Sequence, residues 1–291
     1  MAEFLPLAHR FAAALEQVPA DEAARDPAAA VHAITAATRQ FGWSLTVTHW
    51  DLGVEAEALG ADLTGDPSGT SVTVRRPGSA TGAASITAAT AIAHRLAVTR
   101  GIRGTLGPGM GLAAMLTGPR TLSGLLTGGG RLDALYGPLI RAYVEAGADR
   151  LLIVEGREAV RPAGAPVDPV RPAGAAVDPV GPAGAAVEVS RALRSVASTA
   201  RYFRVPAMVL DLGDTGLADY PGFDHVFGRD DAVLLPASAI CGAPGEASAG
   251  LAGASVVTTA GQIPADCPPA LVARWTEHIR RSGKPDSPMV S

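Results

Sequence analysis

Two kinds of hydrophobic pattern follow one another along the chain. Short runs such as SLTVTHWD (Ser44–Asp51) and RLLIVEG (Arg150–Gly156) are typical of strands, and the second is typical of a buried parallel strand. Segments with apolar residues at helical spacing lie between them, and the clearest runs from Arg131 to Asp149. Strands that alternate with helices predict an α/β fold with a mostly parallel sheet, open or closed. Further strands are predicted at 71–76, 111–119, 207–213 and 254–261, and further helices at 7–18, 26–41, 86–101, 190–203 and 268–282.

Residues 160–189 have a different composition. They consist of three ten-residue copies, VRPAGAPVDP, VRPAGAAVDP and VGPAGAAVEV. Each copy contains proline and glycine, which disfavour a continuous helix or a central strand. Three such short units cannot bury a core of their own. We therefore predict one domain over residues 1–291, in which residues 160–189 form a flexible loop without a chemical role.

Composition and charge exclude several classes of protein. Of the 291 residues, 47% are hydrophobic and 18% are charged, which is enough apolar material for a folded core. The net charge is −4 and no basic stripe is present, so nucleic-acid binding has little electrostatic support. The chain has no apolar run of about 18 residues that could span a membrane, and its first residues do not read as a signal peptide. We therefore expect a cytoplasmic protein with no membrane partner.

Metal and imine chemistry also have little support. The two cysteines, Cys241 and Cys267, exclude a disulfide framework, and no H-x-C, C-x-x-C or H-E-x-x-H motif is present. The only lysine, Lys284, lies near the C-terminus, which nearly excludes an imine-forming lysine in the core. We predict no metal site and no cofactor.

Candidate site residues are sought where predicted strands end, because sites of parallel α/β folds form at the carboxyl ends of strands. His49 and Asp51 end the strand Ser44–Asp51 and, with a period of two, share one face. They could bind or protonate a substrate. The alternative is that Asp51 caps the following helix. His9 lies in a predicted helix and is expected to be structural.

Two further strand ends carry polar side chains. Glu155 follows the apolar run LLIV, and it is either catalytic or paired with a nearby arginine. Asp211 lies inside the apolar strand AMVLDLG, where a carboxylate needs a hydrogen bond or has a shifted pKa. Thr117 and Arg120 lie in the turn T-G-P-R-T, whose small residues and following helix suit an anionic group, although an ordinary strand–helix turn is the alternative.

Four segments, in this order, resemble the uroporphyrinogen decarboxylase superfamily. That superfamily also includes zinc-dependent corrinoid and coenzyme M methyltransferases and the catalytic half of cobalamin-independent methionine synthase. The resemblance implies a (β/α)8-type TIM barrel with its site at the carboxyl ends of the strands. It also implies that Asp51, placed at the end of the first barrel strand, is the catalytic aspartate that stabilises a cationic intermediate. The four segments are DPAAAVHAITAATRQFGWSLTVTHWDLGVEAEALGADL, GLAAMLTGPRTLSGLL, LYGPLIRAYVEAGADRLLIVEG and TTAGQIPADCPPALVARWTEHIRR.

The chain departs from the family at several positions. The R-Q-A-G-R segment that grips substrate carboxylates is absent, and Leu125 stands in place of a substrate-contacting tyrosine. The zinc-binding H-x-C motif of the methyltransferases is replaced by residues 210–212, and Ala260 stands where a further zinc-binding cysteine is expected. The stretch between Gly213 and Ala254 is short, so a full βα unit is expected to be missing and the barrel to be incomplete or distorted in its C-terminal half.

Three functions remain open from the sequence. The first is a metal-independent lyase or decarboxylase acting on a small anionic organic substrate, with Asp51 and His49 as acid, base or cation stabiliser. In that hypothesis Glu155 and Asp211 line the pocket, and Arg120 with Thr117 binds the anion. The second is methyl transfer without the usual zinc site, with substrate and donor juxtaposed or the methyl carrier supplied by a partner protein. The third is a non-catalytic barrel that binds a ligand or partner. Relatives in the family often dimerise, so the resemblance implies a homodimer.

Overall fold

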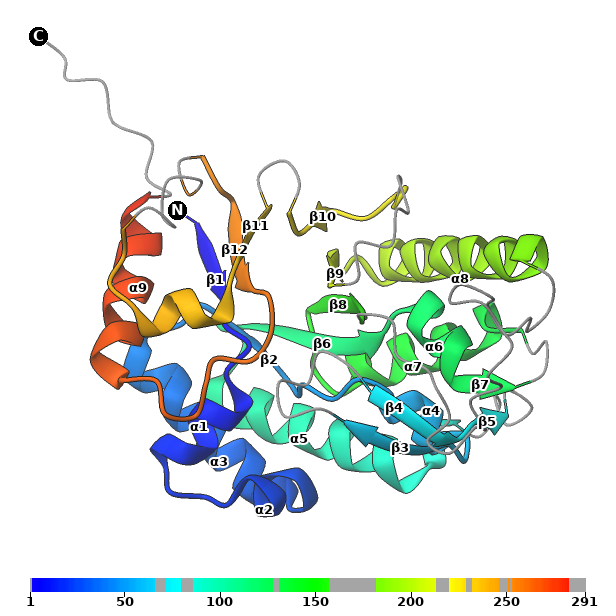
Figure 1. The fold of residues 1–291 in the computed structure, drawn as a ribbon, viewed down its shortest axis with the longest axis horizontal. Coiled ribbons are helices and arrows are strands. Elements are labelled where there is room, and N and C mark those ends of the chain that lie inside the picture. Colours follow the sequence, from blue (N-terminus) through cyan, green and yellow to red (C-terminus); the bar gives the residue numbers. More distant parts are fainter. Residues whose placement is uncertain are drawn as a thin grey trace, which may run out of the picture.

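The computed structural model describes residues 2–65, 72–79, 86–127, 131–156, 182–212, 220–228, 232–245, 251 and 253–282 (Figure 1). The first two repeat copies and the start of the third lie outside the described residues. The remainder of the third copy, from Pro182, forms the first turns of a helix that was predicted to begin at Ser190. Proline at the start of a helix loses no intrahelical hydrogen bond, so it does not prevent this earlier start.

Within the described part of the chain, eight parallel strands form two sheets, with the orders β2-β6-β8-β9-β10 and β11-β12-β1. Because β12 pairs with β1, the two sheets follow one another in chain order, as in a (β/α)8-type barrel. No ladder between described residues joins β1 to β2 or β10 to β11, so the barrel is distorted at these two places. The eight strands are β1 (Glu3–Leu5), β2 (Leu45–Val47), β6 (Gly111–Thr117), β8 (Arg150–Glu155), β9 (Ala207–Asp211), β10 (His225–Val226), β11 (Ala232–Leu235) and β12 (Val256–Thr259).

Helices surround the strands, and two small sheets lie beside them (Figure 1). The small sheets are the antiparallel pair β3 (Asp62–Gly65) with β4 (Val72–Arg76), and the parallel pair β5 (Gly78–Ser79) with β7 (Leu126–Thr127). The helices are α1 (His9–Leu15), α2 (Ala20–Arg25), α3 (Pro27–Phe41), α4 (Val54–Ala58), α5 (Thr90–Leu106), α6 (Pro119–Leu125), α7 (Asp133–Glu145), α8 (Pro182–Phe203), α9 (Pro269–Ser282) and the 3-10 helix η2 (Ala237–Cys241).

The helix α3 shows why the sequence sets these boundaries. The Asp26 side chain accepts a hydrogen bond of 2.9 Å from the amide of Ala28, and Pro27 occupies the first turn. Gly42 ends the helix in the left-handed conformation, at φ 63°. These caps confirm the helix predicted over residues 26–41.

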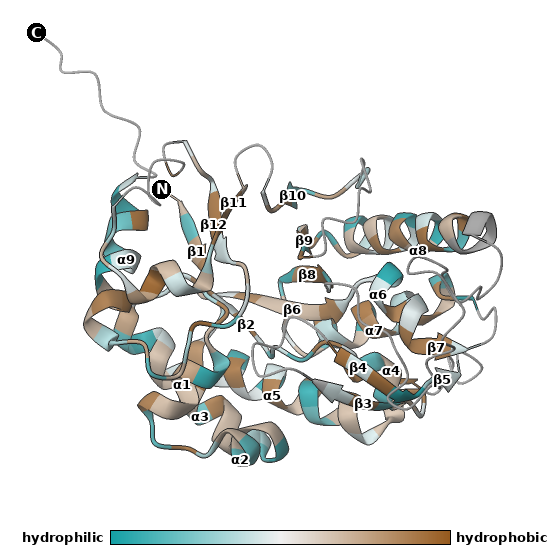
Figure 2. Ribbon diagram, in the orientation of Figure 1, coloured by the Kyte–Doolittle hydropathy of each residue, from teal (hydrophilic) through white to brown (hydrophobic). Residues whose placement is uncertain are grey.

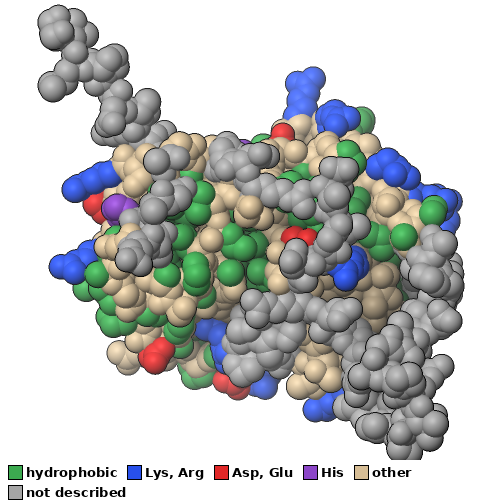
Figure 3. Space-filling model, turned by 45° about the horizontal axis from the view of Figure 1, so that its top comes forward, with side chains coloured by type: hydrophobic (Ala, Val, Ile, Leu, Met, Phe, Trp, Pro, Cys, Tyr) green, Lys and Arg blue, Asp and Glu red, His purple; other side chains and the backbone are tan. Residues whose placement is uncertain are grey.

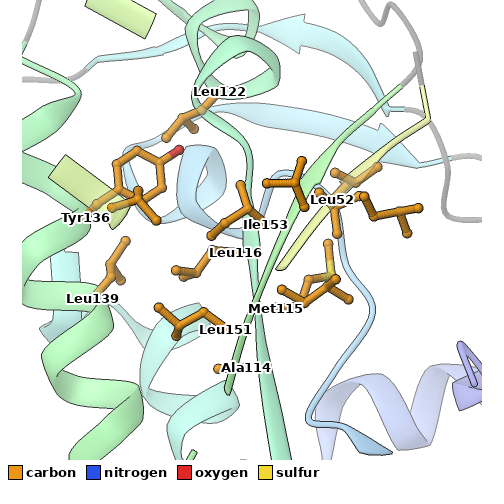
Figure 4. Packing of buried hydrophobic residues seen from close by; sticks show 14 of the residues in the cluster. Leu52, Ala114, Met115, Leu116, Leu122, Tyr136, Leu139, Leu151 and Ile153 are labelled. Atoms are coloured by element: carbon orange, nitrogen blue, oxygen red, sulfur yellow. The ribbon is translucent and has the colours of Figure 1, made fainter. Parts of the chain in front are cut away.

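The core lies between the strands and the helices that cover them. Strands β6, β8 and β9 are buried along most of their length, which agrees with their nearly continuous apolar sequence. Leu116 of β6 and Ile153 of β8 lie near Leu139 and Tyr136 of α7 in this core (Figure 4). In Figure 2 hydrophobic residues gather on the strands and on the inner sides of the helices, and hydrophilic residues mark outer surfaces such as that of α9.

The sequence predicts a missing βα unit in the C-terminal half, but β10 and β11 are both present between β9 and β12. In this stretch the described residues contain the 3-10 helix η2 but no α-helix. The C-terminal half therefore keeps its strands, and its described residues supply fewer helices than those of the N-terminal half.

One expectation about the strand order is wrong. Asp51 was placed after the first barrel strand, but β1 comes earlier and makes β2 the second strand. The sequence Glu3–Leu5 is too short to show a hydrophobic period. Its strand conformation depends on pairing with Val256–Thr258, about 250 residues away.

The outer surface adds two observations. None of the helices in the described ranges is long and apolar enough to cross a membrane. On the face shown in Figure 3, hydrophobic side chains lie among scattered basic and acidic side chains.

Candidate active site

A cavity of about 570 Å³ opens at the carboxyl ends of β1, β2 and β12. His9 follows β1, residues 48–52 follow β2, and Gln262 follows β12, and all of them line it. Side chains of α1, α2, α3 and α5 complete the wall. The cavity therefore lies at the place where no ladder joins β1 to β2, within the size range of cavities that bind small organic molecules.

Asp51 lies in this cavity and is paired with Arg95 of α5. The Asp51 Oδ2 atom accepts a hydrogen bond of 2.5 Å from Arg95 Nη2, and the two side chains are 34% and 14% exposed. The alternative role for Asp51, as the cap of the following helix, is not what the structure shows. Helix α4 begins after Gly53 and has no side-chain cap. Asp51 is thus available to a ligand from the cavity side.

Two buried histidines lie next to the ion pair. His9 Nε2 is 3.2 Å from the carbonyl oxygen of Val47, and because a carbonyl only accepts, Nε2 carries the proton. His49 Nδ1 is 2.8 Å from Thr48 Oγ1, and its ring stacks on Tyr143. Burial, with a smaller effect of the Arg95 charge, lowers the pKa of His9 to about 4 and the pKa of His49 well below its usual value. Both rings are therefore neutral at pH 7.

Several side chains that line the cavity have a buried polar atom with no hydrogen-bond partner among the described residues. They are Nδ1 of His9, Nε2 of His49, Nε1 of Trp50 and Nε of Arg95. Buried polar atoms without a partner are costly and uncommon in folded proteins. A bound molecule that offers a complementary hydrogen-bonding group would remove this cost.

Glu155 and Arg120 lie elsewhere. The Glu155 carboxylate is buried and accepts hydrogen bonds from the amides of Arg120 (3.1 Å) and Thr121 (2.8 Å) and from Thr121 Oγ1 (2.8 Å). The turn predicted to bind an anion therefore holds the protein's own carboxylate at the start of α6. Burial raises the pKa of Glu155 above its usual value, and these hydrogen bonds oppose the rise. Neither residue lines the cavity.

Thr117 and Asp211 also lie outside the cavity wall. The Thr117 hydroxyl and amide donate to the buried carboxylate of Glu55 at 2.5 and 3.2 Å. Burial, partly opposed by these hydrogen bonds, raises the pKa of Glu55 to about 7. Asp211, at the end of β9, accepts a hydrogen bond of 3.0 Å from the Tyr220 hydroxyl. Of the predicted site residues, only Asp51 and His49 line the cavity.

Several polar residues of the cavity received no site role from the sequence, among them His9, Trp50, Arg95 and Gln262. The sequence does carry a signal for Arg95. This arginine stands three residues after Ile92 and four before Thr99, so a charged side chain falls on the buried face of a helix. His9 had none, since the strand that positions it is too short to recognise.

Zinc is the metal that the family resemblance implies, and the residues present do not fit it. Among the described residues, no group of three or more His, Cys, Asp or Glu side chains is placed to hold a metal ion. The thiols of Cys241 and Cys267 instead contact each other. Burial, followed by that contact, raises the pKa of Cys267 to about 12, so this thiol keeps its proton. We derive no step through zinc.

The buried His9 predicts a pH dependence of stability. In the unfolded chain its pKa is about 6.5, whereas in the folded chain it is about 4. As the pH falls from 6.5 to 4, His9 becomes protonated in the unfolded state but stays largely neutral in the folded state. The free energy of unfolding therefore falls by about 3 kcal/mol. Chemical denaturation at pH 7 and pH 4 should show this loss.

The variant His9→Gln isolates the effect, since other titrating groups cancel in the comparison with wild type. We expect His9→Gln to lose less stability than wild type between pH 7 and pH 4. The control His32→Gln, at a largely exposed ring, should behave as wild type. Identical pH slopes for wild type and His9→Gln would contradict a neutral buried His9.

No family model matches this chain, and no curated protein matches it significantly. Among solved structures, a methyltransferase from Methanosarcina mazei superimposes with a TM-score of 0.65 at 18% identity, over 96% of this chain and 94% of its own. A protein placed in the dihydrodipicolinate synthase family, from Coccidioides immitis, gives a TM-score of 0.35 at 15% identity over 89% and 59%, which is too low for a comparison of folds. The strand order and the first likeness together show that this chain has a (β/α)8-type barrel fold, which it shares with that methyltransferase.

Proposed function

We propose that this chain is an enzyme that transfers a methyl group to or from a small organic molecule held in the cavity, without a zinc-bound thiolate. One observation carries the proposal: the cavity joins the Asp51–Arg95 pair to two neutral imidazoles, each with a ring nitrogen that has no partner among the described residues. The overall likeness to a methyltransferase supports this reaction class over the other two.

The chemistry needs a proton acceptor and a positioning group. When an O–H, N–H or S–H group takes a methyl group, the new bond to carbon forms, the bond between carbon and the donor breaks, and the proton must leave. His9 Nδ1 carries no proton, because Nε2 donates to the Val47 carbonyl and the ring is neutral. With a pKa of about 4 and a buried Nδ1, the ring takes up that proton only in the step itself, when methylation makes the attacked group strongly acidic and the ligand contacts the ring. The Asp51–Arg95 pair orients the acceptor beside it.

The same pair makes a decarboxylase less suitable. In that hypothesis Asp51 stabilises a cation that forms on the substrate. Here the carboxylate already faces the Arg95 guanidinium, which neutralises it. A carboxylate with its charge compensated stabilises a second cation poorly.

Labelled methyl groups would test the proposal. The protein is incubated with deuteromethyl cobalamin or deuteromethyl S-adenosylmethionine and a panel of thiols, phenols, amines and carboxamides, and products are read by mass spectrometry. We expect at least one deuteromethylated product, reduced at least about 100-fold in His9→Gln, the usual weight of a general base. His32→Gln should keep full activity. No labelled product above the protein-free blank, or equal yields from His9→Gln and wild type, would exclude this function.

A further inference from the structure

The wall of the cavity is divided into a polar side and an apolar side. The polar side holds the ion pair, the two imidazoles and Trp50. Small apolar side chains of three consecutive helices form another part of the wall, beside Arg10 and Asp21 of the same helices. We call this part the alanine wall; it consists of Ala13, Ala23, Ala24, Ala30, Ala33 and Ile34. Its small side chains leave most of the cavity beside it open.

Helix α2 contributes a row of alanines to the lining of the cavity. Ala20, Ala23 and Ala24 stand at i, i+3 and i+4, so they share one face of the helix, and all three line the cavity. None of the six residues of α2 is buried. The apolar face of α2 therefore borders the cavity, where a bound apolar group would cover it.

The polar side specifies the head group of such a molecule. The Arg95 guanidinium, which is 14% exposed, can only donate, so it calls for an acceptor oxygen. The Asp51 carboxylate, which is 34% exposed, accepts, so it calls for an O–H or N–H group. A head group that carries both kinds of atom can pair with both side chains.

The charges of the wall do not require an anion. Two arginines, Arg10 and Arg95, and two aspartates, Asp21 and Asp51, line the cavity, so their formal charges cancel. A neutral head group enters such a site without an uncompensated charge.

We infer that the molecule bound here is amphipathic, with an aromatic or aliphatic body against the alanine wall and an uncharged head that both accepts and donates hydrogen bonds, as a carboxamide does. This inference rests on the proposed function, since it names the substrate class of the same cavity. It replaces the small anionic substrate expected from the sequence.

Calorimetric titration with three probes tests the inference. The probes are 2-naphthamide, which has body and head; acetamide, which has the head alone; and 2-naphthoate, which has the same body with an anionic head. We expect 2-naphthamide to bind at least about tenfold more tightly than acetamide, because only it buries apolar surface against the alanine wall. We expect 2-naphthoate to bind no more tightly than 2-naphthamide.

Two variants locate the binding. Ala23→Leu fills the apolar side from an incompletely buried position of α2 and should weaken 2-naphthamide at least about tenfold, with acetamide unchanged. Ala14→Leu, at an exposed position of α1 outside the cavity, should leave both affinities unchanged. Equal affinities for 2-naphthamide and acetamide, tighter binding of 2-naphthoate, or an unaffected Ala23→Leu variant would each overturn the inference.

The binding test and the methylation test can fail independently of each other. Binding of 2-naphthamide with no labelled methyl product in any assay would leave the ligand class standing and remove the methyltransferase proposal. Methylation of a small charged acceptor, without binding of 2-naphthamide, would support the methyltransferase proposal and remove the ligand class.

Discussion

Replacing Asp51 by asparagine should lower kcat/KM for methyl transfer at least about 100-fold, while the free energy of unfolding changes by less than about 1 kcal/mol. The two effects separate because the carboxylate is one-third exposed in the cavity, where an ion pair adds little stability. Asparagine keeps the shape but loses the charge that holds the Arg95 guanidinium in place. Turnover and urea denaturation of the same preparation measure the two quantities.

The exposed pair Arg141–Glu145 offers a matched control, since it lies on α7 and does not line the cavity. Glu145→Gln also removes one carboxylate from an arginine pair, and it should leave both turnover and stability as in wild type. An Asp51→Asn variant with wild-type turnover would remove Asp51 from the mechanism.

Replacing Gly118 by alanine should destabilise the protein by at least about 2 kcal/mol. A Cβ atom at this position would lie 2.2 Å from the Glu155 carboxyl carbon, far closer than any real contact. The backbone itself tolerates alanine, with φ −65° and ψ 150°. The cost therefore comes from displacing the carboxylate that holds the amides of Arg120 and Thr121. Thermal and urea unfolding would measure it.

Gly104 provides the comparison, because no atom lies within 4 Å of the position its Cβ would take. It lies exposed in α5, where alanine is the better helix former, so Gly104→Ala should stabilise the protein by about 0.5–1 kcal/mol. A Gly118→Ala variant as stable as wild type would show that Glu155 can leave the start of α6 without cost.

Much of the fold could be predicted because its signals are local. The helix α3 carries its own caps, and β8 is a continuous apolar run with helical segments on either side. The strand β1 could not be predicted, since three residues contain no period and their conformation depends on β12 at the other end of the chain. The earlier start of α8 was missed because proline was interpreted as a breaker rather than as a first-turn residue.

The candidate site could be predicted only where a side chain directly follows a strand that was recognised. Asp51 and His49 meet that condition and lie in the cavity. Glu155 and Thr117 meet it as well, yet their polar atoms are used by Arg120, Thr121 and Glu55. Nothing in the order of residues shows whether a carboxylate at a strand end faces a ligand or a neighbouring amide. Arg95 reaches Asp51 from 44 positions away, which only the packing of α5 reveals.

The seam between β1 and β2 has a dynamic consequence. Because no backbone ladder crosses it, the two sheets can slide or separate there without breaking a single strand–strand hydrogen bond. The hydrogen bond from the His9 ring to the Val47 carbonyl crosses this seam, so it limits how far the cavity can widen. Of the two places without a ladder, this one borders the cavity, so opening here would admit and release a ligand while both sheets keep their hydrogen bonds.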